Sequence, residues 1–257
     1  MKKRTAAVLA AFLIPYITTL AVSGRVQGAD GGRIGGNSDR TSGWESQTDG
    51  RQILLDREDG GRNNGTGYAV PLEEYLIGNC SPTLASLKTA NLFSMPYESE
   101  KELSDQIGYW NQEMEGKGIS VVLLRRHETK ALVYVCRKTR LEKNLKQPGV
   151  VGFLTRYGYQ ITGDLMDVDA ALAHLKERLA GQEGFPHEIG LFLDYPLGDV
   201  IGFIENAGHN FKCSGCWKVY CNECEAVKLF ARYKKCRDVY MRLWHQGRSV
   251  LQLTVAA

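Results

Sequence analysis

The chain has 257 residues, of which 43% are hydrophobic and 24% are charged, and its formal net charge at pH 7 is +3. This length and composition are those of a globular protein with a substantial core in one or two domains. So small a net charge does not by itself indicate binding to nucleic acid or to a membrane surface. The seven cysteines, an odd number, argue against a closed set of disulfides and favour a reducing compartment for the folded part.

The amino-terminal segment has the pattern of an export signal. A basic start, MKKR, precedes an uncharged apolar run over residues 5–24. This order is typical of a signal peptide or an uncleaved anchor, and a run of about 20 residues is near the length that spans a bilayer. Residues 1–24 are therefore predicted to direct export or anchoring, and contact with a membrane is expected only through residues 5–24.

The next segment, residues 25–70, is rich in Gly, Ser, Asn, Asp and Arg. A segment of this composition cannot bury enough apolar surface to offset the entropy lost on ordering. We therefore predict a disordered, flexible linker over residues 25–70 and a single domain over residues 71–257.

The front of the chain resembles a known family. The resemblance is carried by the basic and apolar start, by LLDR at residues 54–57 and by VPLEEYLIG at residues 70–78. These features resemble the front of stage II sporulation protein D, whose relatives are exported peptidoglycan lytic proteins. Nothing after residue 78 resembles the catalytic domain of that family, which argues against peptidoglycan cleavage by this chain.

The first elements predicted in the body are a helix and a hairpin. Within residues 96–118 apolar side chains recur at helical spacing, Ser99 and Glu102 form a capping box, and glycines end the helix. The β-branched and apolar runs ISVVLLRR and ALVYVCRK follow, joined by the polar turn HETK. This order predicts a β-hairpin.

The remaining elements are mostly helical. Short helices are predicted on both sides of Pro148, and an amphipathic helix is predicted over residues 167–179. Residues 187–208 read as two short helices broken at Tyr195-Pro196, WKVY reads as a short strand, and a long helix is predicted over residues 222–247. The predicted fold is α+β: a small sheet, a hairpin plus a short strand, covered by several helices.

A second resemblance covers this body. It is carried by NCSPTLASLKTANLF at 79–93, FPHEIGLFLDYPLGDVIGFIENAG at 185–208, FKCSGCWKVY at 211–220 and the closing SVLQLTVA. Together they resemble the bacterial domain-of-unknown-function family 3793 (DUF3793) over residues 76–257. The resemblance implies no established reaction, and it implies a cytoplasmic protein without an export signal. The two resemblances meet near residue 78, as a fusion, a wrong gene start or the joining of two genes would produce.

Four cysteines lie within CSGCWKVYCNEC, residues 213–224. A tetrahedral zinc site needs its four sulfurs within a few ångströms of one another. If WKVY is extended, the α-carbons of Cys216 and Cys221 lie about 16 Å apart. If the stretch is helical, Cys213 and Cys224 lie about 16 Å apart along the axis. The spacing therefore favours two separate pairs over one four-cysteine site.

The first pair, Cys213 and Cys216, is the leading candidate site. Ser-Gly between the two cysteines makes a turn, which could hold two ligands of a metal or form a redox-active dithiol. Further ligands for zinc or an iron–sulfur cluster could come from Cys80, placed at the start of a predicted helix, from Cys236 or from His209.

The second pair, Cys221 and Cys224, is the less favoured ligand pair. In proteins of the DUF3793 family that this chain resembles, an acidic, glycine-containing turn usually follows WKVY. This chain departs from that pattern, because CNEC follows instead. The pair is predicted at a helix start, where the dipole would favour a thiolate. Cys136, at the end of a predicted strand, is expected to pack in the core.

Two other function classes remain as alternatives. A non-enzymatic interaction module could offer the apolar segment around Tyr195-Pro196 and Phe203 to a protein partner. Nucleic-acid binding through the basic carboxyl-terminal helix is not expected, because its aromatic residues recur at core spacing. His187 and Glu188 do not complete a metalloprotease motif, since Leu191 stands in place of the second histidine. Whether the chain is an enzyme stays open at this point.

Overall fold

The computed structural model describes residues 71–160, 167–181 and 185–256, all of which belong to one compact unit. The predicted export signal and linker, and the resemblance to stage II sporulation protein D up to residue 70, lie outside the described residues. In the described part no helix is long and apolar enough to cross a membrane.

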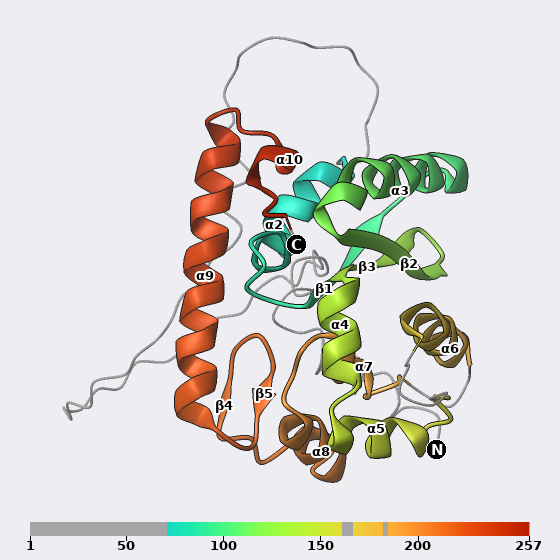
Figure 1. Ribbon diagram of the computed structural model, residues 1–257, viewed down its shortest axis with the longest axis vertical. Coiled ribbons are helices and arrows are strands. Elements are labelled where there is room, and N and C mark those ends of the chain that lie inside the picture. Colours follow the sequence, from blue (N-terminus) through green and yellow to red (C-terminus); the bar gives the residue numbers. More distant parts are fainter. Residues whose placement is uncertain (1–70, 161–166, 182–184, 257) are drawn as a thin grey trace, which may run out of the picture. The chain divides into compact units, whose positions relative to one another are not determined.

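The elements are arranged as follows along the chain (Figure 1). The strands are β1 (Ala90–Pro96), β2 (Ile119–His127), β3 (Lys130–Arg137), β4 (Cys213–Ser214) and β5 (Lys218–Val219). The helices are α2 (Leu72–Leu84), α3 (Glu100–Met114), the 3-10 turn η1 (Glu115–Lys117), α4 (Lys138–Leu145), α5 (Pro148–Thr155), α6 (Val168–Ala180), α7 (Ile189–Phe192), α8 (Leu197–Glu205), α9 (Glu223–His245) and α10 (Val250–Leu253).

The main sheet is antiparallel with the strand order β1-β3-β2, and β4 and β5 form a separate hairpin. The α+β prediction is confirmed, and so is the β2–β3 hairpin. The strand predicted at WKVY pairs only with β4. The third strand of the main sheet is β1, a segment that the sequence patterns leave unassigned, because its side chains are buried without a clear alternation.

The core lies on both faces of this sheet, because alternate residues of the central strand β3 point to opposite sides. Val133 and Val135 join one cluster, packed under α2, α3 and α10. Tyr134 and Cys136 join a second cluster, packed under α4 to α8 and the β4–β5 hairpin. A strand buried on both sides carries a continuous apolar run, which is why β3 is clear in the sequence.

Local capping explains where two predicted helices begin and end. The side chain of Ser99 accepts a hydrogen bond from the backbone N–H of Glu102, as predicted for α3, and Gly118 ends this region at a positive φ of 68°. Asp167 caps α6 in the same way. The four apolar residues predicted for the inner face of α6 are all buried, namely Val168, Leu172, Leu175 and Leu179.

The long helix α9 contributes to both clusters. Figure 1 shows it running along one side of the unit, with the β4–β5 hairpin beside its amino-terminal half and α10 near its other end. Tyr233 packs in the cluster under the hairpin, and Trp244 packs against the cluster under α3. Val227, near the start of the same helix, is 50% exposed and so lies outside the core.

Arg137 joins distant backbone segments at the end of the sheet. Its buried guanidinium donates hydrogen bonds to the carbonyls of Thr83 (2.8 Å), Leu84 (2.8 Å), Lys117 (3.2 Å) and Val255 (2.7 Å). Two of these carbonyls end α2, where the helix dipole also favours a positive charge. One side chain thereby ties the end of α2, the turn before β2 and the carboxyl-terminal segment together.

Candidate functional site

The pair Cys213 and Cys216 lies on the β4–β5 hairpin. Cys213 pairs with Val219, and the turn is closed by a hydrogen bond from the N–H of Gly215 to the carbonyl of Trp217 (3.1 Å). Both thiols are free and half-buried. The C-x-x-C segment thus forms the turn of a short hairpin, as its Ser-Gly centre predicts.

This hairpin is fixed against α9 by close packing. A Cβ at Gly215 would lie 2.2 Å from Cδ2 of Phe230, so a glycine is needed for this approach. The rings of Trp217 and Phe230 meet edge to face, with their centroids 4.6 Å apart. The position of Cys216 relative to α9 is therefore set by neighbouring residues on both sides.

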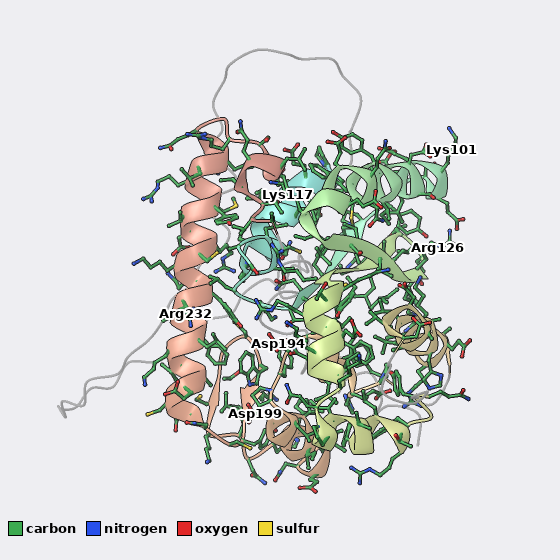
Figure 2. All side chains as sticks on the ribbon, in the orientation of Figure 1. Lys101, Lys117, Arg126, Asp194, Asp199 and Arg232 are labelled. Carbon is green, nitrogen blue, oxygen red and sulfur yellow. The ribbon has the colours of Figure 1, made fainter. Side chains whose placement is uncertain are left out.

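A buried carboxylate in α8 holds the other side of the hairpin. Asp199 accepts hydrogen bonds from the Nε1–H of Trp217 (2.7 Å) and from the backbone N–H groups of Tyr220 and Cys221 (2.8 Å each). Figure 2 labels Asp199 at the end of the unit that contains α8 and the hairpin. Its carboxylate links the two cysteine pairs and shapes the chain between them.

The two thiols of the first pair have neighbours of opposite charge. Burial raises the pKa of Cys216, while the positive charges of Lys88 and Arg237 lower it. Burial raises the pKa of Cys213 as well, and the carboxylates of Glu223 and Asp199 raise it further. A thiolate is accordingly better tolerated at Cys216 than its burial alone would allow, and it is disfavoured at Cys213.

Lys88, in the link between α2 and β1, is the residue that the sequence patterns miss. It is 4% exposed, and its amine faces the rings of Tyr195 (5.2 Å to the centroid) and Tyr233 (5.8 Å). Burial lowers the pKa of Lys88, against the opposing effect of Cys216, Asp194 and Cys80. A lysine between a helix and a strand is usually solvated, so only the tertiary structure reveals this position.

A polar network borders this lysine. The Asp194 carboxylate accepts hydrogen bonds from the N–H (3.2 Å) and hydroxyl (2.9 Å) of Thr89 and from the amide of Asn144 (2.5 Å). Asp194 has a positive φ of 67°, between α7 and α8. The hydroxyl of the next residue, Tyr195, donates to the carbonyl of Cys216 (3.1 Å). Figure 2 labels Asp194 between α4 and α9. The α2–β1 link, α4, the α7–α8 link, the β4–β5 hairpin and α9 therefore converge on one place.

The comparison with protein families identifies the body of the chain. The family model DUF3793, described as a protein of unknown function, matches residues 76–254. The chain belongs to the DUF3793 family. The resemblance stated from the sequence motifs is thereby confirmed, and the match contains every residue of the site described above. No curated protein and no solved structure matches the chain significantly.

The other predicted ligands of this DUF3793 protein lie apart from the first pair. Cys80 is fully buried in the second half of α2, not at a helix start, Cys236 is buried in α9, and His209 is exposed in the loop before β4. Across the described ranges, no three His, Cys, Asp or Glu side chains lie close enough together to hold a metal ion. The predicted set of ligands is therefore not assembled by this part of the fold.

The second pair lies at the start of α9, as predicted. Cys224 is in its first turn, and Cys221 precedes the capping residue Asn222. Both cysteines are exposed. Burial of its sulfur raises the pKa of the Cys221 thiol, and the charge of Asp199, which accepts a hydrogen bond from this thiol, raises it further.

Burial keeps the three core cysteines, Cys80, Cys136 and Cys236, in the protonated and unreactive form. Cys136 packs in the second cluster, as predicted, and burial raises its pKa to about 12. Burial likewise raises the pKa of Cys236 to about 11 and that of Cys80 to a still more basic value. A thiol that stays protonated is neither a nucleophile nor a metal ligand.

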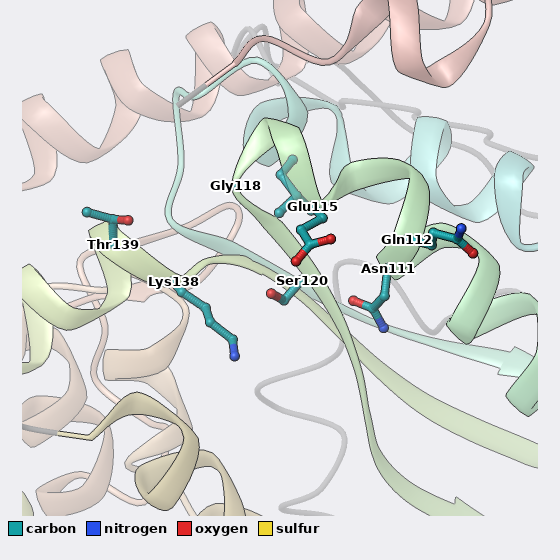
Figure 3. Close-up of a pocket in the computed structure, with 8 residues that line it drawn as sticks. Asn111, Gln112, Glu115, Gly118, Ser120, Lys138 and Thr139 are labelled. Atoms are coloured by element: carbon teal, nitrogen blue, oxygen red, sulfur yellow. The ribbon is translucent and has the colours of Figure 1, made fainter.

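A pocket of about 510 Å³ lies between α3, β2 and α4 (Figure 3). Two of its polar side chains already have partners. Lys138 forms an ion pair with Asp169 (2.6 Å), and the amide of Asn111 exchanges two hydrogen bonds of 2.8 Å with the backbone of Val121. The amide of Asn111 thereby satisfies backbone groups of β2 that a further strand would otherwise pair with at this edge of the sheet. Without a perturbed or convergent reactive group, this pocket is a weaker candidate than the hairpin.

Proposed function

We propose that this DUF3793 protein carries out thiol–disulfide exchange, with Cys216 as the attacking thiol and Cys213 as the resolving thiol. The observation that carries the proposal is the charge asymmetry of the pair. Basic side chains, Lys88 and Arg237, face Cys216, whereas the carboxylates of Glu223 and Asp199 face Cys213. Since the thiolate is the nucleophile, this asymmetry favours attack from Cys216.

The exchange balances without a cofactor. The Cys216 thiolate attacks one sulfur of a disulfide in a partner protein and releases the other sulfur as a thiolate, which takes up a proton. The Cys213 thiol then loses its proton and attacks Cys216 in the mixed disulfide. The products are a Cys213–Cys216 disulfide and a reduced partner dithiol, so two electrons and two protons pass to the partner.

The same cysteines could instead hold zinc or an iron–sulfur cluster, as the sequence also suggests. A tetrahedral site needs four ligands, and a C-x-x-C turn supplies two. Because the described fold brings no third ligand to the pair, the remaining ligands would have to come from another molecule. This makes exchange the better supported proposal.

The test is a redox titration of the full-length protein in glutathione buffers, followed by alkylation, peptide mapping and measurement of bound zinc and iron. We expect one two-electron transition that forms the Cys213–Cys216 disulfide. Cys213→Ser and Cys216→Ser should each abolish it. With a disulfide substrate, Cys213→Ser should accumulate a mixed disulfide faster than Cys216→Ser, because basic side chains favour the thiolate of Cys216 and carboxylates disfavour that of Cys213.

The matched control is the double variant Cys221→Ser, Cys224→Ser, which removes the exposed pair and should leave the transition unchanged. A transition that disappears in this control, or stoichiometric metal lost in Cys216→Ser, would replace the exchange proposal. Circular dichroism of each variant separates loss of the disulfide from loss of the fold.

The alternative of an interaction module loses the surface suggested for it. Tyr195 is 9% exposed and Phe203 is 2% exposed, so both face the core. In α9, Tyr233 is buried and Phe230 packs on the hairpin, so these aromatic residues are not offered to nucleic-acid bases. Neither alternative gains support from the described surface.

A further inference from the structure

The amine of Lys88 occupies an unusual position for a lysine. Its side chain is 4% exposed, although lysine is almost never buried unless it is paired. Its amine faces the rings of Tyr195 and Tyr233, whose centroids lie 5.2 and 5.8 Å from Nζ. This position lies beside the hairpin, but it does not belong to either cysteine pair.

No charge in the described part neutralises this amine by direct contact. The closest carboxylate, Asp194, accepts its hydrogen bonds from Thr89 and Asn144 and lies 3.9 Å from the guanidinium of Arg140. Among the described residues, the side-chain Nζ of Lys88 makes no hydrogen bond or ion pair. An unpaired ammonium is costly to bury, so burial lowers the pKa of Lys88, and a larger fraction of its amine is neutral than in an exposed lysine at the same pH.

We propose that Lys88 is a reactive amine that forms a Schiff base with a small carbonyl compound. The nitrogen lone pair attacks the carbonyl carbon, and the carbonyl oxygen takes up a proton to give a carbinolamine. Loss of water then leaves the imine. One amine and one carbonyl compound give one imine and one water, so neither oxidant nor reductant is needed, and hydrolysis reverses the step.

The surroundings favour this chemistry over simple ion pairing. A neutral imine avoids the cost of burying an ammonium, and a protonated imine keeps the cation–π contacts with Tyr195 and Tyr233. The near-complete burial of Lys88 restricts the reactant to a small molecule.

The experiment traps the imine in the full-length, reduced protein. The protein is incubated with acetaldehyde or with pyruvate in the presence of cyanoborohydride, and the reduced adducts are located by peptide mapping. We expect Lys88 to be labelled faster than the exposed Lys235, because burial lowers the pKa of Lys88 and so raises the neutral fraction of its amine. Preference for pyruvate would show that a carboxylate is also bound, and preference for acetaldehyde would show that it is not.

The comparison of lysines within the wild-type protein needs no variant, so the test survives even if Lys88 is required for folding. Lys88→Arg should abolish the preferred adduct, and Lys235→Arg should leave it unchanged. Labelling spread over surface lysines with both probes, or an unlabelled Lys88, would overturn the proposal. Cys216→Ser should keep the Lys88 adduct while it removes the disulfide, so this proposal and the exchange reaction can fail separately.

Discussion

At the scale of single residues, the site depends on ionisable groups whose burial the sequence does not reveal. Asp199 is 3% exposed and Lys88 is 4% exposed, yet they differ in their partners. Asp199 is satisfied by three N–H donors of the hairpin and the residues after it, whereas the amine of Lys88 faces the rings of Tyr195 and Tyr233. We therefore expect the first residue to stabilise the site, and we propose the second as its reactive amine.

Replacing Asp199 tests its structural role. Asp199→Asn should lower the free energy of unfolding by about 3 kcal/mol, because hydrogen bonds to a charged group are lost and a buried donor meets the new amide. Urea denaturation measures the effect. The control substitution Asp238→Asn, at an exposed residue, should change the free energy of unfolding by less than about 0.5 kcal/mol. Equal urea midpoints for Asp199→Asn and the wild type would show that the three bonds contribute nothing.

At the scale of elements, the β4–β5 hairpin is positioned by its contact with α9 and not by its own strands. Each strand has two residues, which is too short to be stable in isolation. The contact of Gly215 with Phe230 and the hydrogen bonds to Asp199 supply what the strands lack. The hairpin should therefore respond strongly to changes at its packing surface.

A pair of glycine substitutions tests this dependence by thermal unfolding. Gly215→Ala should cost about 1–3 kcal/mol, because its Cβ would overlap the ring of Phe230. Gly108→Ala, in the interior of α3 with no atom within 4 Å of the new Cβ, should stabilise the protein by about 0.5–1 kcal/mol. A Gly215→Ala protein that melts like the wild type would mean that the hairpin packs loosely.

At the scale of the whole molecule, the buried amine links stability to pH. Burial lowers the pKa of Lys88 from its ordinary value of 10.5, so between its pKa in the folded protein and pH 10.5 the unfolded state binds more protons than the folded state. Stability is therefore lost as the pH falls through this range and gained as it rises. Above pH 9 the raised thiol pKa of residues such as Cys216 acts in the opposite direction, because the unfolded thiols ionise first.

The clean range for the measurement is consequently pH 7 to pH 9. Over this range the free energy of unfolding of the wild type should rise relative to that of Lys88→Met, by at most about 1.4 kcal/mol per pH unit. Denaturant titrations of both proteins at several pH values give the difference. Lys235→Met is the exposed control and should show none. A wild-type and Lys88→Met difference that stays constant would mean that the amine keeps its proton in the fold.

Much of the fold could be predicted from the sequence alone. Capping residues such as Ser99 and Asp167, the apolar face of α6 and the alternation around the β2–β3 turn act over a few neighbouring residues. Local interactions of this kind determine which segments become helices and strands. The family motifs likewise lie in the sequence itself, and they identify the domain without any coordinates.

The site was determined in part by the sequence and in part only by the tertiary structure. The C-x-x-C turn is local, so its position as a candidate follows from CSGC. The roles of its two thiols depend on Lys88, Arg237 and Glu223, which come from separate parts of the chain. The identity of β1 as the third strand depends on pairing with β3 in the same way. The burial of a side chain and the charges around it depend on residues from segments that are distant in the sequence, so only the tertiary structure determines them.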